Sequence, residues 1–275
     1  MTKTATTKYE NIDLENKKIN IWRILAYFII YSVVGFVIET IFGFVTKGVL
    51  ESRQSFLYGP FCSIYGIGAI IMITSLQYFK KNNYTLFLGG FLVGSVVEYV
   101  LSFLGEIIFK VNWWDYSDRF LNINGRICFT FSIFWGLLAI YLIKHFNPIV
   151  DKLIDKIKEK SNEKTCKTIV SIGIIFLAVD CLLTGIALKI FFARTVYTYD
   201  LDVADKGKYI IEYNILQKNE TLYNITNTVF SDEKMLRTFP NLNLKSSDES
   251  IIYMNDILDE IQPYYFKFFD KKAER

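Results

Sequence analysis

The chain is poor in the residues that most catalytic and metal sites need. It has one histidine, His145, which excludes a histidine-rich metal site and argues against Ser-His-Asp chemistry. Its four cysteines show no Cys-x-x-Cys spacing and none follows residue 193, which excludes a disulfide-stapled C-terminal part. It has no Gly-x-x-x-x-Gly-Lys-Ser/Thr phosphate loop, so nucleotide hydrolysis would need a partner. The sequence predicts no metal, no cofactor and no identifiable nucleophile, which weighs against an enzyme.

The chain also has no large excess of positive or negative charge. The net charge is +3, made up of −3 in residues 194–275 and +6 in the rest of the chain. Neither part has the dense basic face that nucleic acid requires, so nucleic-acid binding is excluded.

Apolar residues are abundant. They make up 52% of the chain, and the mean hydropathy is +0.25 although the last eighty residues are polar. A bilayer core about 30 Å thick needs roughly 20 apolar residues in a helix. Five stretches qualify, at Trp22–Val45, Tyr58–Phe79, Tyr84–Phe109, Ile127–Lys144 and Thr168–Phe192. The expected fold class is an all-α integral membrane protein, a bundle of about five transmembrane helices with a small C-terminal soluble module.

Basic residues predict the orientation of these spans. With the N-terminus inside, the inner side carries fourteen Lys/Arg and the outer side eight. We expect a multi-pass membrane protein with a cytoplasmic N-terminus. It would have a cytoplasmic segment 1–21, a transmembrane domain 22–193, and a soluble tail 194–275 on the outside.

Two polar segments have open interpretations. The linker 147–167 is basic and amphipathic, with Ile149, Leu153, Ile154 and Ile157 on one helical face. It is either an interfacial helix on anionic lipid or a solvated connector. The tail predicts a small helical or mixed module. Helix starts are expected at Ser231 and Ser247, and turns at Asn219, Asn224 and Asn241.

Acids within the spans are candidates for function, because an unpaired carboxylate in hydrocarbon is costly. Glu39 lies between Gly35 and Gly43, and Glu98 follows Gly90 and Gly94 on its helix face. These glycines let neighbouring backbones approach, so a polar pocket shared by Glu39 and Glu98 is expected. For Glu106 and Asp180 we favour a structural hydrogen bond between helices instead.

The segment Asn112–Arg126, NWWDYSDRFLNINGR, is the densest polar and aromatic stretch. Its rings suit a membrane interface, but its polar residues indicate a loop that turns at Asn124-Gly125 and folds back toward the membrane. Arg53, Asp115 and Arg126 are expected to form a charged vestibule above the two acids, with Asp115 paired to one arginine. The candidate pocket residues are Glu39, Arg53, Tyr58, Glu98, Asp115, Tyr116, Ser117, Asn122 and Arg126.

Two segments, LYGPFCSIYGIGA from Leu57 and NWWDYSDRFLNINGRICFTFSIFWGLL from Asn112, carry a resemblance. The chain resembles a bacterial family of ABC-transporter permeases of the CmpB type. Glu39, Glu98 and the Trp114–Ser117 core match the family pattern, and Asp232–Met235 with Phe239–Asn241 is similar to its usual ending. Gln54 and Ser63 depart from it, since the family has glycine and proline there.

The resemblance implies a permease-like transport subunit of unknown substrate, with a separate ATPase or a second copy of the chain as its partner in the lipid bilayer. One alternative is a membrane enzyme acting on a lipid or lipid-linked substrate at the outer leaflet. In it Asp115 or Glu98 would be the general base and an arginine would hold a phosphate. A structural or sensory membrane protein is a third.

Overall fold

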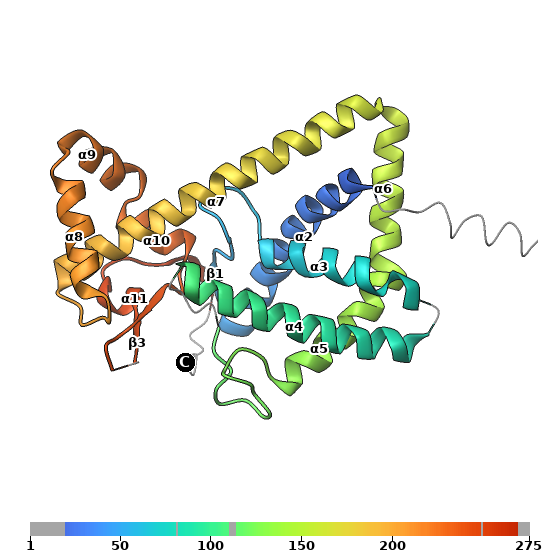
Figure 1. Cartoon of the computed structure of the whole chain (residues 1–275), viewed down its shortest axis with the longest axis horizontal. Coiled ribbons are helices and arrows are strands. Elements are labelled where there is room, and N and C mark those ends of the chain that lie inside the picture. Colours follow the sequence, from blue (N-terminus) through green and yellow to red (C-terminus); the bar gives the residue numbers. More distant parts are fainter. Residues whose placement is uncertain (1–19, 81, 110–113, 249, 269–275) are drawn as a thin grey trace, which may run out of the picture.

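Long apolar helices dominate the computed structural model, which describes residues 20–80, 82–109, 114–248 and 250–268. Four helical segments are long and apolar enough to cross a membrane. They are α2 (Ile21–Lys47), α4 (Asn83–Phe109), the continuous segment that begins with α5 (Phe129–Tyr141), and α7 (Glu163–Tyr199). The expected all-α membrane fold class is confirmed (Figure 1). The expected segment 1–21 lies almost wholly outside the described residues.

The second expected span, Tyr58–Phe79, is wrong at its start. The helix α3 runs only from Ser63 to Leu76, followed by a 3₁₀ turn, Gln77–Phe79. Residues 52–62 form a loop, in which Gly59 adopts a positive φ of 78° and the Ser55 amide donates to the Phe61 carbonyl. This backbone pairing replaces the helix that hydropathy alone predicts, and it leaves α3 shorter than a bilayer requires.

The prediction also ends the fourth span, Ile127–Lys144, too early. After α5 the helix continues through a π-helical turn, Leu142–Phe146, into α6 (Asn147–Lys160), and α7 begins three residues later. Figure 1 shows the chain changing direction at this turn, so that α6 runs across the end of α2–α5. A π-helical turn is a recognised cause of such a bend. The expected linker 147–167 is therefore two helices rather than one.

Small residues set the distances between helices. A Cβ added to Gly35 of α2 would collide with Tyr65 of α3, and one added to Gly94 of α4 would lie 2.5 Å from Trp135 Cβ of α5. In lipid, helices associate through close van der Waals packing because there is no hydrophobic gain between them. The predicted close approach at the glycine faces is thus observed for α2 with α3 and for α4 with α5.

The tail packs on the far end of α7. It contains α8 (Lys206–Gln217), α9 (Glu220–Val229), α10 (Asp232–Thr238), α11 (Met254–Ile257) and the short strands β2 (Asn243–Lys245), β3 (Ile251–Tyr253) and β4 (Tyr264–Lys267). Phe191, Phe192 and Val196 of α7 are buried in one hydrophobic cluster with residues of α10, β2 and α11. Arg194 fixes the start of α10 through Asp232 and the Phe230 carbonyl.

Two antiparallel strand pairs complete the fold. β2 pairs with β3, and β4 pairs with β1 (Val49–Glu51), which directly follows α2. The second pair joins the chain's C-terminal part to the end of the first membrane helix. Among the tail predictions, Ser231 does cap α10, but residues 246–248 turn between strands and Asn224 lies within α9. A helix start at Ser247 and a turn at Asn224 were therefore wrong.

Candidate functional site

Glu98 is a buried carboxylate in the membrane-spanning part of α4, with 6% of its surface exposed. Both of its oxygens accept hydrogen bonds. Trp135 Nε1 of α5 donates to Oε2 at 2.9 Å, and Tyr116 Oη donates to Oε1 at 3.1 Å. Two donors on a buried carboxylate offset much of its desolvation cost. The site is therefore built from α4, α5 and the loop between them.

Tyr116 reaches Glu98 because its loop folds back against the bundle. The Tyr116 amide donates to the Gly125 carbonyl at 2.7 Å, and Trp114 Nε1 donates to the Arg126 carbonyl at 2.9 Å. The Tyr116 ring stacks on Phe131 of α5 with 4.6 Å between ring centroids. The fold-back expected for this segment is present in residues 114–126, whereas Asn112 and Trp113 lie outside the described residues.

The turn at Asn124-Gly125 gives the loop its shape. Asn124 and Gly125 both have positive φ, at 53° and 65°, and Ile123 bridges to Ile127. A Cβ on Gly125 would lie 2.5 Å from Asp115 Oδ1, so only glycine fits. The Asn122 side chain accepts from the Gly125 amide and donates to the Ser117 carbonyl. Asn122 is therefore placed as a structural residue of the loop.

Asp115 does not pair with an arginine, contrary to expectation. Its Oδ1 accepts from the Ser117 amide at 2.9 Å and from Ser117 Oγ at 2.6 Å, and both residues are exposed. This is a local turn in which the carboxylate satisfies a nearby backbone amide.

The two arginines have other acidic partners. Arg53 pairs with Glu51 at 2.6 Å. Arg126 pairs with Glu106 of α4 and donates to Ser102 Oγ at 3.2 Å. Glu106 also pairs with Lys245 of the tail. The expected vestibule of Arg53, Asp115 and Arg126 is not formed, and Glu106 joins α4, the loop and the tail, which fits the structural role expected for it.

Glu39 of α2 lies on the same side of the bundle as Glu98. The side chains of Tyr65 and Tyr116 each lie within the range of Coulombic interaction of both Glu39 and Glu98. Tyr65 comes from α3 and fits over Gly35, one turn before Glu39. The described residues form no hydrogen bond or ion pair with Glu39, which is partly exposed. Both acids therefore act electrostatically on the same two tyrosines.

Tyr58 is held in a separate contact. Its amide donates to Asp180 Oδ2 of α7 at 3.1 Å, and its hydroxyl accepts from Lys234 Nζ of α10 at 3.0 Å. The neighbouring Leu57 amide donates to Thr184 Oγ1 at 2.8 Å. Asp180, 1% exposed, therefore bonds the loop before α3, whereas the expected bond was one between helices. Tyr58 links the loop to α7 and the tail, away from the contacts of Glu98.

Sequence reasoning missed two groups of polar residues. Trp135 is an ordinary aromatic residue of an apolar span, and only packing shows that it donates to Glu98. At the other end of the bundle, Arg23 of α2 pairs with Asp151 and Asp155 of α6. Tyr27 Oη donates to Asp151 in the same group, and Tyr31 Oη donates to Asn147. A polar stripe of Arg23, Tyr27 and Tyr31 at four-residue spacing was the available signal.

No group of three His, Cys, Asp or Glu side chains in the described ranges is arranged to hold a metal ion. The arrangement around Glu98 can accept hydrogen bonds or attract positive charge, and an aromatic loop residue covers it.

The apolar helices and the buried intramembrane acid define a polytopic membrane protein. A family model described as putative ABC-transporter type IV (ABC_trans_CmpB) matches residues 26–185. The match covers more than half of the chain, so the protein belongs to this family, as the motifs indicated. It includes every candidate pocket residue and ends before the tail. Comparison with curated proteins and with solved structures found no match.

Proposed function

We propose that the chain is the permease-like subunit of a transporter in a bacterial plasma membrane, driven by a separate ATPase. The N-terminus would be cytoplasmic and the tail 194–275 outside, following the basic asymmetry of the flanking segments. In this proposal residues 22–193 form the translocating domain. The family assignment supports a transporter-related role, and the missing phosphate loop assigns ATP hydrolysis to a partner.

The observation that carries the proposal is the position of Glu98. An ionisable side chain buried between membrane helices marks a substrate or ion pathway more often than a packing site. Here the carboxylate is covered by Tyr116, a residue of a loop and not of a helix. Displacement of this loop would uncover Glu98 without disturbing the contact of α4 with α5.

The same residues favour one charge on the substrate. Glu98 and Glu39 are both acids, and Tyr116 and Trp135 donate to Glu98. Carboxylates and aromatic faces attract cations and repel anions. Arg53 and Arg126, the arginines among the candidate pocket residues, are each paired with an acid. We therefore propose a substrate that carries positive charge or several hydrogen-bond donors.

Copurification and uptake test this function together. The tagged full-length chain is isolated from its native membranes in mild detergent and assayed for vanadate-sensitive ATP hydrolysis. The eluate is then reconstituted into vesicles, and ATP-dependent uptake of the cation tetraphenylphosphonium is measured. We expect an ATPase to copurify with the wild type and with Glu98→Gln, and uptake to fall in Glu98→Gln.

A matched control is Glu220→Gln in α9, which removes an exposed acid far along the chain from the site. It should leave both readings unchanged. An eluate without ATP hydrolysis would contradict an ATP-driven permease. Equal uptake by wild type and Glu98→Gln would show that Glu98 does not take part in transport.

A further inference from the structure

The helix α6 has an apolar face without a partner in the described residues. Ile149, Leu153 and Ile157 follow one another at four-residue spacing, with 62%, 50% and 48% of their surfaces exposed. The neighbouring Val150 and Ile154 turn inward and pack in the cluster that contains Tyr27 and Tyr31. The exposed stripe is therefore not needed to hold α6 on the bundle.

Basic residues flank this stripe. Lys152, Lys156 and Lys160 also follow a four-residue spacing and are exposed, and none forms an ion pair within the part of the chain that the structure describes. The acids Asp151 and Asp155 face α2, where Arg23 pairs with both. Of the acids of α6, Glu159 is exposed, and the side chain of Asp155 is 49% exposed although Arg23 pairs with it. The accessible side of α6 is thus apolar along one line and positive along the next.

The orientation of α6 suits a bilayer surface. It runs across the ends of α2–α5, at the end of the bundle away from the tail (Figure 1). A helix lying there is parallel to the membrane plane, because the other helices cross it. In that orientation an apolar stripe can enter the boundary of the acyl chains while lysines beside it reach the headgroups.

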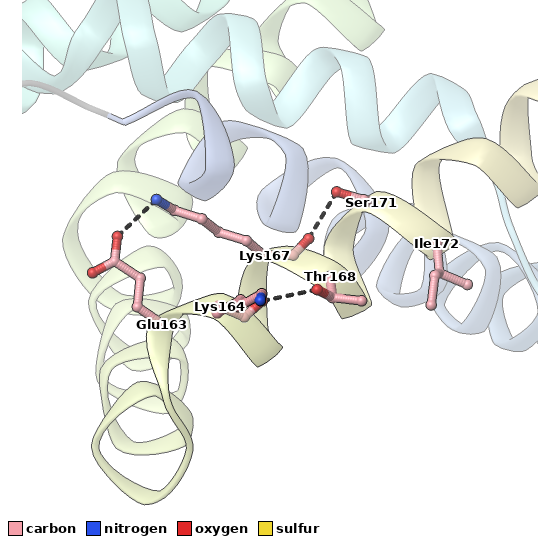
Figure 2. Close-up of a pocket in the computed structure, with 6 residues that line it drawn as sticks. All are labelled: Glu163, Lys164, Lys167, Thr168, Ser171 and Ile172. Carbon is pink, nitrogen blue, oxygen red and sulfur yellow. Dashed lines mark hydrogen bonds and ion pairs between the residues drawn. The ribbon is translucent and has the colours of Figure 1, made fainter.

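The first turns of α7 extend the basic surface. Figure 2 shows an open hollow lined by Glu163, Lys164, Lys167, Thr168, Ser171 and Ile172, beside α2 and α6. Lys167 pairs with Glu163 at 2.8 Å and lies 5.9 Å from the ring centroid of Trp22. A tryptophan at this level is typical of a membrane interface.

We propose that α6 and the start of α7 form a binding surface for anionic phospholipid headgroups. Ile149, Leu153 and Ile157 enter the boundary of the acyl chains, and Lys152, Lys156 and Lys160 pair with lipid phosphates. Lipid fits better than a protein partner because the exposed apolar stripe is narrow and is flanked by positive charge. Binding there would fix α6, and through Arg23 the start of α2, to the inner membrane surface.

Thermal unfolding of the full-length protein in detergent tests the proposal. The midpoint is compared with added phosphatidylglycerol and with added phosphatidylcholine. We expect phosphatidylglycerol to raise the wild-type midpoint more than phosphatidylcholine does, because a ligand of the folded state stabilises it. The double variant Lys152→Gln/Lys156→Gln should lose most of this difference.

The matched control is Lys208→Gln/Lys218→Gln in and after α8, which removes the same charge from exposed tail lysines. It should respond as the wild type does. Equal responses of the two double variants would overturn the proposal. So would loss of a copurifying protein from Lys152→Gln/Lys156→Gln with the phosphatidylglycerol response intact, because the surface would then bind a protein.

A nitroxide at Leu153→Cys in vesicles gives a second reading. Its relaxation should respond more to oxygen than to a water-soluble nickel complex, whereas a nitroxide at Leu222→Cys of α9 should show the reverse. A label at position 153 that is as open to nickel as the one at 222 would place α6 in water and overturn the proposal. Neither reading depends on transport.

Discussion

The carboxylate of Glu98 shows how one residue can connect three segments. Its two oxygens each accept one bond, from Trp135 of α5 and from Tyr116 of the following loop. Removing the carboxylate leaves both donors without a partner in a buried place, and each unpaired donor costs about 1–3 kcal/mol. The loop and α5 would then each lose one hydrogen bond to α4.

Substitutions at Glu98 should therefore follow a defined order of stability. We expect Glu98→Ala to lower the unfolding midpoint in detergent most. Glu98→Gln should lower it less, because its single amide oxygen still accepts one of the two bonds. Tyr116→Phe should cost about 1 kcal/mol, because stacking on Phe131 remains. If Glu98→Ala unfolds at the wild-type temperature, the carboxylate does not hold the loop.

Asp115 should be far more tolerant. An arginine partner would have made Asp115→Asn strongly destabilising, but the observed partner is Ser117. An asparagine oxygen can accept the same bond from the Ser117 amide, so we expect a change below about 1 kcal/mol. Thermal unfolding checks this expectation. A large loss in Asp115→Asn would show that the exposed carboxylate has a partner beyond this chain.

A pair of glycine substitutions tests the packing of α2 on α3. Gly35→Ala places a methyl group against Tyr65 and should cost about 1–3 kcal/mol through overpacking. Gly68→Ala is the matched control, because nothing lies within 4 Å of a Cβ there. It should be neutral or raise stability by up to about 1 kcal/mol, since alanine is the better helix former. Similar midpoints for both variants would contradict the close contact.

At the scale of elements, local patterns predict more than contacts between distant segments. Apolar runs predicted four of the five spans, and Ser231 predicted the cap of α10. Both signals are local in the sequence. The start of α3 was not predicted, because the apolar run extends back to Tyr58, whereas Gly59 and the Ser55–Phe61 pairing delay the helix to Ser63. The ion-pair partners of Arg53 and Arg126 depend on how the elements pack. The sequence contains several acids and does not indicate which of them pairs with each arginine.

Substituting the two partners of Glu106 tests how the loop and the tail are attached to α4. Arg126 is 16% exposed at its side chain and also bonds Ser102, whereas Lys245 is 49% exposed. An exposed ion pair contributes about 0–1 kcal/mol, so Lys245→Gln should change the midpoint little. Arg126→Gln should cost about 1–3 kcal/mol because it breaks a more buried bond.

Limited proteolysis provides a second measurement for this pair. Cleavage within the tail should be faster in Lys245→Gln, and cleavage in the loop 114–126 should be faster in Arg126→Gln. If both variants accelerate cleavage only in the tail, Glu106 does not hold the loop.

At the scale of the whole molecule, the length of α7 determines how far apart the turn after α6 and the tail lie. Its 37 residues span roughly 55 Å at about 1.5 Å per residue, more than the roughly 40–45 Å of a complete bilayer. The turn after α6 and the tail lie at its opposite ends (Figure 1). They must then face opposite aqueous compartments, whichever way the protein is inserted.

Cysteine accessibility determines which side of the membrane each end of α7 faces. In a chain with its four native cysteines replaced, single cysteines are introduced at Ser161 before α7 and at Ser247 in the tail. A membrane-impermeant maleimide added to intact cells should label position 247 and spare position 161, because the basic residues that flank the spans predict a cytoplasmic α6 side. After the cells are opened, both should react. The reverse pattern would place the tail and the loop 114–126 in the cytoplasm. It would also move the α6 surface to the outer leaflet, where its lysines would have fewer anionic lipids to bind.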